Sequence, residues 1–231
     1  MARRLVLFDI DGTLITDGGA SRGSFKHALE AVYGYAGDLS VYDFSGRTDP
    51  QIARMVLRDA GFTDDAITAK LDELWSVYLK GLAANATRER VRALPGIREL
   101  VDALHEHDDV TLALLTGNIE PGARLKLASP ELNEYFPFGA FGSDSPRREE
   151  LPPFAVERAS AIDGYRFEGA DVVIIGDSIY DVRCGVPYDA TTIAVASGKT
   201  PADKLRAENP KHFFESAEDL DGMLKAILSR A

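Results

Sequence analysis

Short apolar runs recur along the chain, and each ends abruptly in polar residues or glycine. Six such runs occupy residues 5–10, 110–115, 138–141, 171–175, 191–196 and 212–214. Continuous hydrophobicity without alternation is typical of strands covered on both faces, as in a parallel sheet between two layers of helices. The intervening segments have helical spacing of their apolar residues, near residues 97–104, 154–162 and 220–228. The pattern predicts an α/β fold with a doubly wound, mainly parallel sheet.

The connection between the first apolar run and the second is far longer than the sheet requires. It spans about ninety residues, whereas a crossover between parallel strands needs about 10 to 12. Three of its stretches have helical periodicity, near residues 25–32, 52–56 and 71–78. Thr48 and Pro50 mark a helix start, with a capping side chain and a proline in the first turn. We therefore predict a small helical domain at residues 16–92, inserted into an α/β core of residues 1–15 and 93–231.

Composition and charge narrow the class of protein. With 45% hydrophobic and 27% charged residues the chain is close to the globular average, which excludes collagen-like and wholly disordered proteins. Its 26 Lys and Arg against 37 Asp and Glu give a net charge of −11, so neither nucleic acid nor a membrane surface is an expected partner. No apolar run approaches the roughly 18 to 20 residues that span a bilayer. Cys184 is the only cysteine, which excludes an intrachain disulfide and favours a cytoplasmic location.

Polar residues gather where three of the predicted strands end. Seven of them are Asp9, Asp11, Thr116, Gly117, Asn118, Asp177 and Asp181. The carboxyl ends of parallel strands share one rim of the sheet, where folds of this class bind ligands. Asp9 and Asp11 point to the same side, so a cation is expected to neutralise them. Carboxylate ligands without His or Cys suit Mg²⁺, which retains several waters and also binds a substrate phosphate.

The same residue types suit phosphoryl transfer. An Asp carboxylate can accept a phosphoryl group covalently, while a second carboxylate acts as an acid and then as a base. The Thr116 hydroxyl and the N–H groups that follow it can hold phosphoryl oxygens. A fixed cation is still missing from this set.

In its motifs the chain resembles the haloacid-dehalogenase superfamily of Mg²⁺-dependent phosphohydrolases. The motifs are Asp9-x-Asp11-Gly12-Thr13-Leu14, a strand ending in Thr116-Gly117-Asn118, and Gly176-Asp177-x-x-x-Asp181. The helical insert is similar to the first cap type of that superfamily, as in phosphoglycolate phosphatase and β-phosphoglucomutase. The resemblance implies that Asp9 is the nucleophile and Asp11 the general acid and base. It also implies that Asp9, Asp11 and Asp177 hold the metal, with Asp181 supporting the metal shell.

One position departs from the pattern of the superfamily. A lysine usually bridges nucleophile and phosphate between the second and last motifs, but no lysine lies between Lys126 and Lys199. Arg147 and Arg148 occupy the expected stretch, and Arg148 resembles the arginine that some branches use there. Arginine is permanently cationic and grips phosphate with two N–H groups, so we predict that Arg148 binds the phosphoryl group. Which of the two arginines points inward stays open.

Two stretches of the insert are candidates for a role in the reaction: one for substrate selection and one for the hinge on which the cap moves. Residues 45–49 precede a helix start where caps of this type place a substrate-reading loop, and Arg47 is predicted to contact an anionic part of the substrate. The alternative is a solvated arginine beside a simple helix cap. Residues 16–19 contain two glycines and are predicted to form the hinge of the cap, with a plain loop as the alternative.

Together these observations predict a cytoplasmic, Mg²⁺-dependent phosphatase, monomeric or homodimeric, that hydrolyses a small phosphorylated metabolite through an aspartyl-phosphate. A sugar-phosphate mutase of the same fold is the first alternative. A haloacid dehalogenase needs neither a metal nor a second carboxylate, so Asp11 and Asp177 argue against it. A non-catalytic phospho-ligand binding protein would gain from losing the repulsive pair of carboxylates. The substrate depends on the geometry of the cap and cannot be predicted from the sequence.

Overall fold

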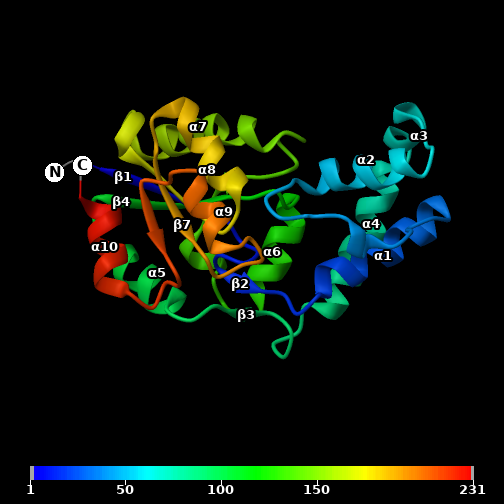
Figure 1. Ribbon diagram of the computed structural model, residues 1–231, viewed down its shortest axis with the longest axis horizontal. Coiled ribbons are helices and arrows are strands. Elements are labelled where there is room, and N and C mark those ends of the chain that lie inside the picture. The colour runs from blue at the N-terminus through cyan, green and yellow to red at the C-terminus, as the bar shows by residue number, and fades with distance from the viewer. Residues whose placement is uncertain (1–2, 230–231) are drawn as a thin grey trace.

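A six-stranded parallel sheet forms the centre of the protein. The computed structural model describes residues 3–229, so residues 1, 2, 230 and 231 of the predicted core lie outside the described part. The strand order is β5-β4-β1-β6-β7-β8, and all neighbours are parallel. The strands are β1 (Arg4–Phe8), β4 (Val110–Leu115), β5 (Gly139–Ala140), β6 (Val172–Gly176), β7 (Thr191–Val195) and β8 (His212–Phe214) (Figure 1). Each predicted apolar run overlaps one of these strands, and the predicted fold class is confirmed.

Helices cover both faces of the sheet, which explains the unbroken apolar runs. Along β1, Val6 and Phe8 pack into the cluster that contains α5 and α10, whereas Leu5 and Leu7 pack into the cluster with α7 and α8. All four side chains are completely buried, so polar residues have no place in this strand. The helices of this part are α5 (Ile97–His105), α6 (Glu120–Ala128), α7 (Leu151–Asp163), α8 (Ile179–Gly185), α9 (Ala202–Ala207) and α10 (Leu220–Leu228).

The chain builds the sheet outward from β1 in two directions. β4 and β5 follow on one side of β1, and β6, β7 and β8 follow on the other. The carboxyl ends of β1, β4 and β6 are therefore neighbours at the point where the strand order reverses. Doubly wound folds bind their ligands at such a point.

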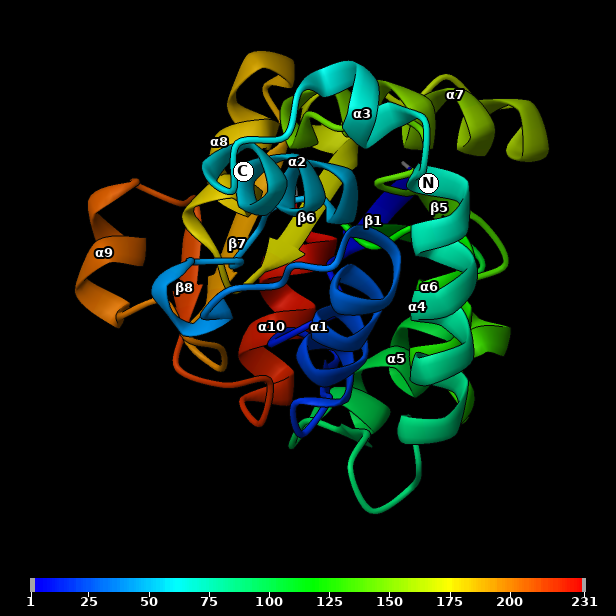
Figure 2. The same ribbon diagram turned by 90° about the vertical axis from the view of Figure 1, so that its right-hand side faces the viewer.

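Four helices form a separate group beyond the carboxyl ends of the strands, and we name them the cap helices (Figures 1 and 2). They are α1 (Ala20–Tyr33), α2 (Asp49–Asp59), α3 (Asp64–Thr68) and α4 (Leu71–Asn85). Their apolar faces share one cluster, in which the centre of the Phe25 ring lies 5.7 Å from that of Tyr78 and 6.4 Å from that of Trp75. Thr48 caps α2 as predicted, because its Oγ1 accepts the Gln51 N–H at 3.2 Å.

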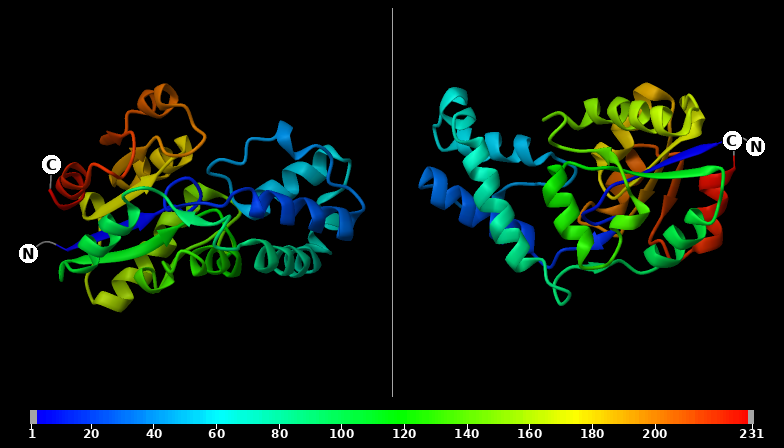
Figure 3. Two further views of the ribbon diagram at one scale, coloured as in Figure 1. Left: turned by 90° about the horizontal axis from the view of Figure 1, so that it is seen from below. Right: turned by 180° about the vertical axis from the view of Figure 1, so that it is seen from behind.

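The two connections between the sheet and the cap helices pair with each other. β2 (Ile15–Thr16) and β3 (Arg92–Ala93) are antiparallel, and the two crossing segments lie side by side (Figure 3). The sequence pattern predicts neither strand, because two residues are too few to show alternation. The boundaries predicted between residues 15 and 16 and between 92 and 93 run through this pair. The division of the chain into a core and a cap domain stays a prediction.

The helices of the protein are short. Among residues 3–229, none is both long and apolar enough to cross a bilayer. The cytoplasmic location and the oligomeric state, a monomer or a homodimer, stay predictions.

Candidate active site

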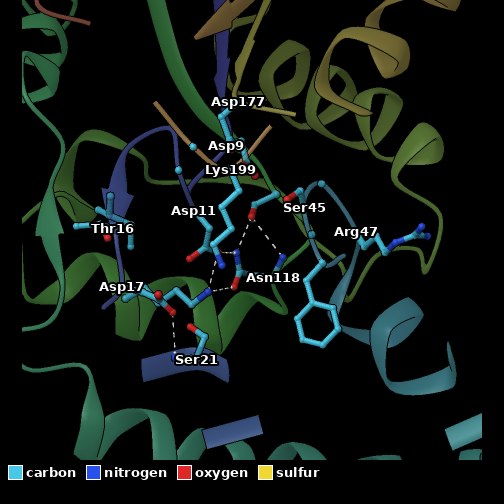
Figure 4. Close-up of a pocket in the computed structure, with 18 of the residues that line it drawn as sticks. Asp9, Asp11, Thr16, Asp17, Ser21, Ser45, Arg47, Asn118, Asp177 and Lys199 are labelled. Atoms are coloured by element: carbon cyan, nitrogen blue, oxygen red, sulfur yellow. Dashed lines mark hydrogen bonds and ion pairs between the residues drawn. The ribbon is translucent and has the colours of Figure 1, made fainter. Parts of the chain in front are cut away.

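Three buried carboxylates meet at the carboxyl ends of β1 and β6. Asp9 directly follows β1, Asp177 directly follows β6, and Asp181 lies in the first turn of α8. One carboxylate oxygen of each lies within 4.8 Å of the others, and all three residues are buried. Figure 4 shows Asp9 and Asp177 close together at one end of a cavity. The structure thus brings together three of the acidic residues that the sequence singles out.

Two glycines make room for the carboxylate of Asp177. A Cβ atom on Gly12 would lie 2.5 Å from Asp177 Oδ2, and one on Gly198 would lie 1.6 Å from the same oxygen. Gly12 also has a φ of +88°, which side chains other than glycine rarely adopt. The Thr13 hydroxyl donates to Asp177 Oδ1 at 3.4 Å. Gly12 and Thr13, which follow Asp11, therefore help to position the carboxylate of Asp177, although Asp177 is far away in the sequence.

Of the two candidate arginines, Arg147 and Arg148, it is Arg148 that places a cation in the site. Its Nη2 donates to Asp9 Oδ1 and to the Leu115 carbonyl, both at 3.0 Å, and its side chain is 3% exposed. The Arg147 side chain is 65% exposed and pairs with Glu150. Arg148 is therefore the inward residue of the pair, beside the predicted nucleophile.

Asp181 has structural partners as well as a place in the acidic cluster. Its Oδ2 accepts the Ser178 N–H at 2.9 Å, and its own N–H donates to the Ser178 hydroxyl oxygen at 3.3 Å, which forms a capping box at the start of α8. The Ser178 hydroxyl also donates to Oδ2, at 2.6 Å. Its Oδ1 accepts from Arg148 Nη2. Both oxygens are thus already bonded to protein groups, and direct ligation of a metal by Asp181 stays a prediction.

The acidic cluster carries more negative charge than its protein partners offset. Burial raises the pKa of Asp9 to about 7, with Arg148 acting in the opposite direction and Asp181 raising it further. Burial is also the main cause that raises the pKa of Asp177, followed by the charges of Asp9 and Asp181. Crowded carboxylate oxygens with raised pKa values are the environment that a small divalent cation stabilises. These residues therefore fit Mg²⁺.

The three residues after β4 adopt an arrangement that the sequence only partly predicts. Thr116 is fully buried, and its Oγ1 accepts from the Asn118 side-chain Nδ2 at 2.8 Å and from the Asn118 N–H at 3.3 Å. The Gly117 carbonyl accepts the Asp49 N–H at 2.7 Å. The Asn118 N–H that was predicted for the phosphoryl group thus bonds to Thr116 here. Phosphate binding by Thr116, Gly117 and Asn118 stays a prediction.

Asp11 has a cationic partner that the sequence analysis missed. Its side chain is 40% exposed, and its Oδ2 accepts from Lys126 Nζ and from Asn118 Nδ2, each at 2.7 Å. Lys126 lies on α6 and is buried together with Ala123 and Leu127. A lysine in the apolar stripe of a helix is the signal that could have identified it, because lysine is rarely buried without a partner.

The loop before α2 is fastened to the core. Asp49 Oδ2 accepts the Ile119 N–H at 2.9 Å, and the Thr48 hydroxyl donates to the Pro146 carbonyl at 2.7 Å. Burial raises the pKa of Asp49 to about 6, while the charge of Lys126 acts in the opposite direction. These two hydrogen bonds join the start of α2 to the core, next to the residues that follow β4.

Arg47 lines the cavity, but its guanidinium has protein partners. Its Nε donates to the Asp43 carbonyl at 3.0 Å, and the guanidinium lies 5.4 Å from the centre of the Tyr180 ring. Figure 4 shows the side chain pointing away from Asp9 and Asp11. Contact between Arg47 and a substrate stays a prediction, and it would require the side chain to turn.

The cavity has a volume of about 460 Å³ and lies between the cap helices and the core. Asp9, Asp11 and Asp177 line it on the core side, and Ser45 and Ile52 on the cap side. Lys199, from the loop after β7, also lines it (Figure 4). The volume is that of a site for a small molecule.

The family model described as haloacid dehalogenase-like hydrolase matches residues 6–185 of this chain, and a HAD-hydrolase-like model matches residues 153–220. The chain belongs to the haloacid dehalogenase-like hydrolases. A pyrophosphatase, PpaX, from Halalkalibacterium halodurans is 26% identical over 224 residues, covering 93% of this chain and 94% of the relative. A phosphoglycolate phosphatase from Agrobacterium fabrum is 29% identical over 210 residues, covering 88% of this chain and 85% of the relative.

Solved structures agree on the fold of this haloacid dehalogenase-like hydrolase. A hydrolase from Pseudomonas syringae has a TM-score of 0.74 at 20% identity, covering 98% of this chain and all of the other. A putative β-phosphoglucomutase from Thermotoga maritima has a TM-score of 0.63 at 19% identity, with coverages of 97% and 100%. The predicted superfamily is confirmed, and so is the predicted class of enzyme, a hydrolase of the phosphatase kind.

The raised pKa of Asp9 predicts how the stability of the metal-free hydrolase depends on pH. An unfolded Asp has a pKa of about 3.9, and folding raises that of Asp9 to about 7. Between these values the folded state binds more protons, so the free energy of unfolding is expected to fall as the pH rises from about 4 to about 7. Thermal unfolding in a chelator, followed across this range, measures the effect.

An Asp9→Asn variant is the control for this pH dependence. It lacks the titrating group, so its melting temperature is expected to fall less steeply than that of the wild type over the same range. Mg²⁺ is expected to raise the wild-type melting temperature most at the upper end, where the carboxylates are ionised. Parallel curves for the two proteins would show that Asp9 is not the group responsible.

Proposed function

We propose that the protein is an Mg²⁺-dependent phosphatase that hydrolyses a small phosphorylated metabolite through an aspartyl-phosphate on Asp9. The observation that carries the proposal is the placement of two carboxylates on one cavity wall: Asp9 buried beside Arg148, and Asp11 accessible at its side. A nucleophile and an acid–base group in this arrangement suit two-step phosphoryl transfer. The names of the relatives, pyrophosphatase and phosphoglycolate phosphatase, support the same type of reaction.

In the first step a carboxylate oxygen of Asp9 attacks phosphorus. The bond between phosphorus and the leaving oxygen breaks, and Asp11 donates its proton to that oxygen. Arg148 lies beside Asp9 and offsets the charge of the phosphoryl oxygens. The Thr116 hydroxyl and the Gly117 N–H lie at the same rim, and we propose that they hold the phosphoryl group.

In the second step Asp11 takes a proton from a water molecule, which attacks phosphorus. The bond between phosphorus and the Asp9 oxygen breaks, so inorganic phosphate and the free carboxylate are restored. We propose that Asp9, Asp177 and the Asp11 carbonyl would hold Mg²⁺, with Asp181 beside it. When bound, the ion supplies positive charge that offsets the carboxylates and the phosphoryl oxygens.

The cap helices would select the leaving group and exclude bulk water. The loop before α2 is already hydrogen-bonded to the core through Thr48 and Asp49, so the cavity is covered on this side. Exclusion of water strengthens the charge interactions on which the first step depends. A cavity of about 460 Å³ suits a small metabolite.

A panel of phosphorylated metabolites, assayed for inorganic phosphate with Mg²⁺ and with a chelator, tests the proposal. We expect at least one member to release phosphate, and the chelator to stop the release. A panel without any release, or release that persists undiminished in the chelator, would refute it. The mutase alternative differs in the product, because it returns the phosphoryl group to a sugar and yields an isomer in place of free phosphate.

A further inference from the structure

A lysine buried at the edge of the cavity is not used by the proposed reaction. The Lys126 side chain is 3% exposed, and it lies in the apolar stripe of α6. Burying an ammonium group costs free energy unless it is paired and hydrogen-bonded. Burial acts to lower the pKa of Lys126, but the charges of the Asp11 and Asp49 carboxylates raise it. The side chain therefore remains a cation in the folded protein.

The contacts of Lys126 form a closed set with Asp11 and Asn118. Lys126 Nζ donates to Asp11 Oδ2 at 2.7 Å and to Asn118 Oδ1 at 2.5 Å. Asn118 Nδ2 donates to the same Asp11 Oδ2 at 2.7 Å. Each of the three side chains thus bonds to the other two. This arrangement fixes the plane of the Asp11 carboxyl group.

The two oxygens of Asp11 are consequently different. Oδ2 accepts two hydrogen bonds from donors that have no acceptor capacity to offer in return. Oδ1 has no hydrogen bond within residues 3–229, and the Asp11 side chain is partly exposed to the cavity. Two donors therefore occupy Oδ2, and Oδ1 is the oxygen left to face a molecule in the cavity.

Resting on the proposed function, we propose that Lys126 is a positioning residue that, together with Asn118, presents Oδ1 of Asp11 as the oxygen that transfers the proton. Lys126 lines the cavity, but its side chain is only 3% exposed and its hydrogen bonds go to Asp11 and Asn118, so we assign its effect to Asp11. The charges of two further carboxylates, those of Asp17 and Asp49, also act on the ammonium group and raise the pKa of Lys126. They help to keep it charged while its hydrogen bonds go to Asp11 and Asn118.

A pair of substrates that differ in their need for an acid tests this proposal. An alkyl phosphate has a leaving group that must be protonated, whereas the nitrophenolate of nitrophenyl phosphate leaves without a proton. In a Lys126→Met variant, rapid-quench measurement of the first step is expected to show a loss of about 10²- to 10⁴-fold with the alkyl phosphate. With nitrophenyl phosphate the burst of product is expected to change less than tenfold. Lys126→Arg, which keeps the charge and the donors, is expected to recover part of the alkyl rate.

Two controls separate positioning from a structural role. Lys225→Met replaces an exposed lysine on α10 and is expected to leave both rates unchanged. In an Asp11→Asn background, Lys126→Met is expected to add no further loss, because its effect passes through Asp11. If Lys126→Met does not fold, Lys126→Gln takes its place in the same assays.

The outcomes distinguish this inference from the proposed function. Equal losses with both substrates, or no loss with either, would overturn the positioning role while leaving the phosphatase intact. An additive loss in the Asp11→Asn background would also overturn it. If the wild-type protein neither forms a phosphoenzyme nor releases phosphate from either substrate, the proposed function itself fails.

Discussion

Replacing Asp9 by Asn is expected to abolish phosphate release, with a loss of about 10⁴- to 10⁶-fold in kcat, as for removal of a nucleophile in other covalent mechanisms. Asn has nearly the same volume, so packing at the end of β1 should be preserved. It also lacks the charge whose burial raises the pKa of Asp9 to about 7. The folded state is therefore expected to be at least as stable as that of the wild type. Phosphate release and thermal unfolding measure the two effects.

Asp108→Asn is the matched control for this substitution. Asp108 is exposed in the turn between α5 and β4 and lies outside the cavity, so activity and melting temperature are expected to stay at wild-type values. An acid quench during turnover should trap phosphoprotein in the wild type and none in Asp9→Asn. Near-normal activity of Asp9→Asn, or a trapped phosphoprotein in that variant, would rule out the aspartyl-phosphate on this residue.

Arg148→Met is expected to be the most destabilising substitution of a charged residue in the site. It leaves Asp9 and Asp181 buried without their cation, and breaking a buried ion pair in this way costs about 3–5 kcal/mol of unfolding free energy. On the proposed function the Arg148 charge faces the phosphoryl group, so its loss is also expected to reduce kcat by about 10²- to 10³-fold. Denaturant unfolding in a chelator measures the first effect, and phosphate release the second.

The neighbouring arginine provides the control within the same turn. Arg147 is exposed and pairs with Glu150 at the surface, so Arg147→Met is expected to change the unfolding free energy by no more than about 0.5 kcal/mol. Mg²⁺ should restore part of the stability of Arg148→Met, because the ion offsets the same carboxylates. Equal effects of the two substitutions would contradict the inward role of Arg148.

The core of the fold is predictable because a strand buried on both faces is an unbroken run of apolar residues in the sequence. Val6 and Phe8 face one helix layer and Leu5 and Leu7 face the other, so all four had to be apolar. The pair of β2 and β3 contains no such run. Each strand has only two residues, and the two strands come from segments far apart in the sequence. They pair only because the whole insert brings them together.

The candidate site is predictable where residues follow strands and unpredictable where partners meet across the fold. Asp9 and Asp177 follow β1 and β6 directly, so the order of strands places them together. Arg147 and Arg148 are adjacent and chemically identical, and only the local turn decides which one is buried. Lys126 lies between the second and last motifs but 115 residues from Asp11, and nothing in the sequence shows that the two side chains meet.

The pairing of β2 with β3 has a consequence for how such proteins diversify. Both ends of the helical insert enter and leave the core side by side, with Ile15 opposite Ala93 and Thr16 opposite Arg92. Neighbouring strands are only about 5 Å apart, so any replacement module whose own ends lie that close can be spliced in at the same point. On the proposed function, exchange of the module would alter the choice of substrate, while Asp9 and Asp177 keep their places after β1 and β6 and Arg148 keeps its place in the turn before α7. The pairing of β2 with β3 therefore lets the insert be exchanged without moving the ends of β1 and β6.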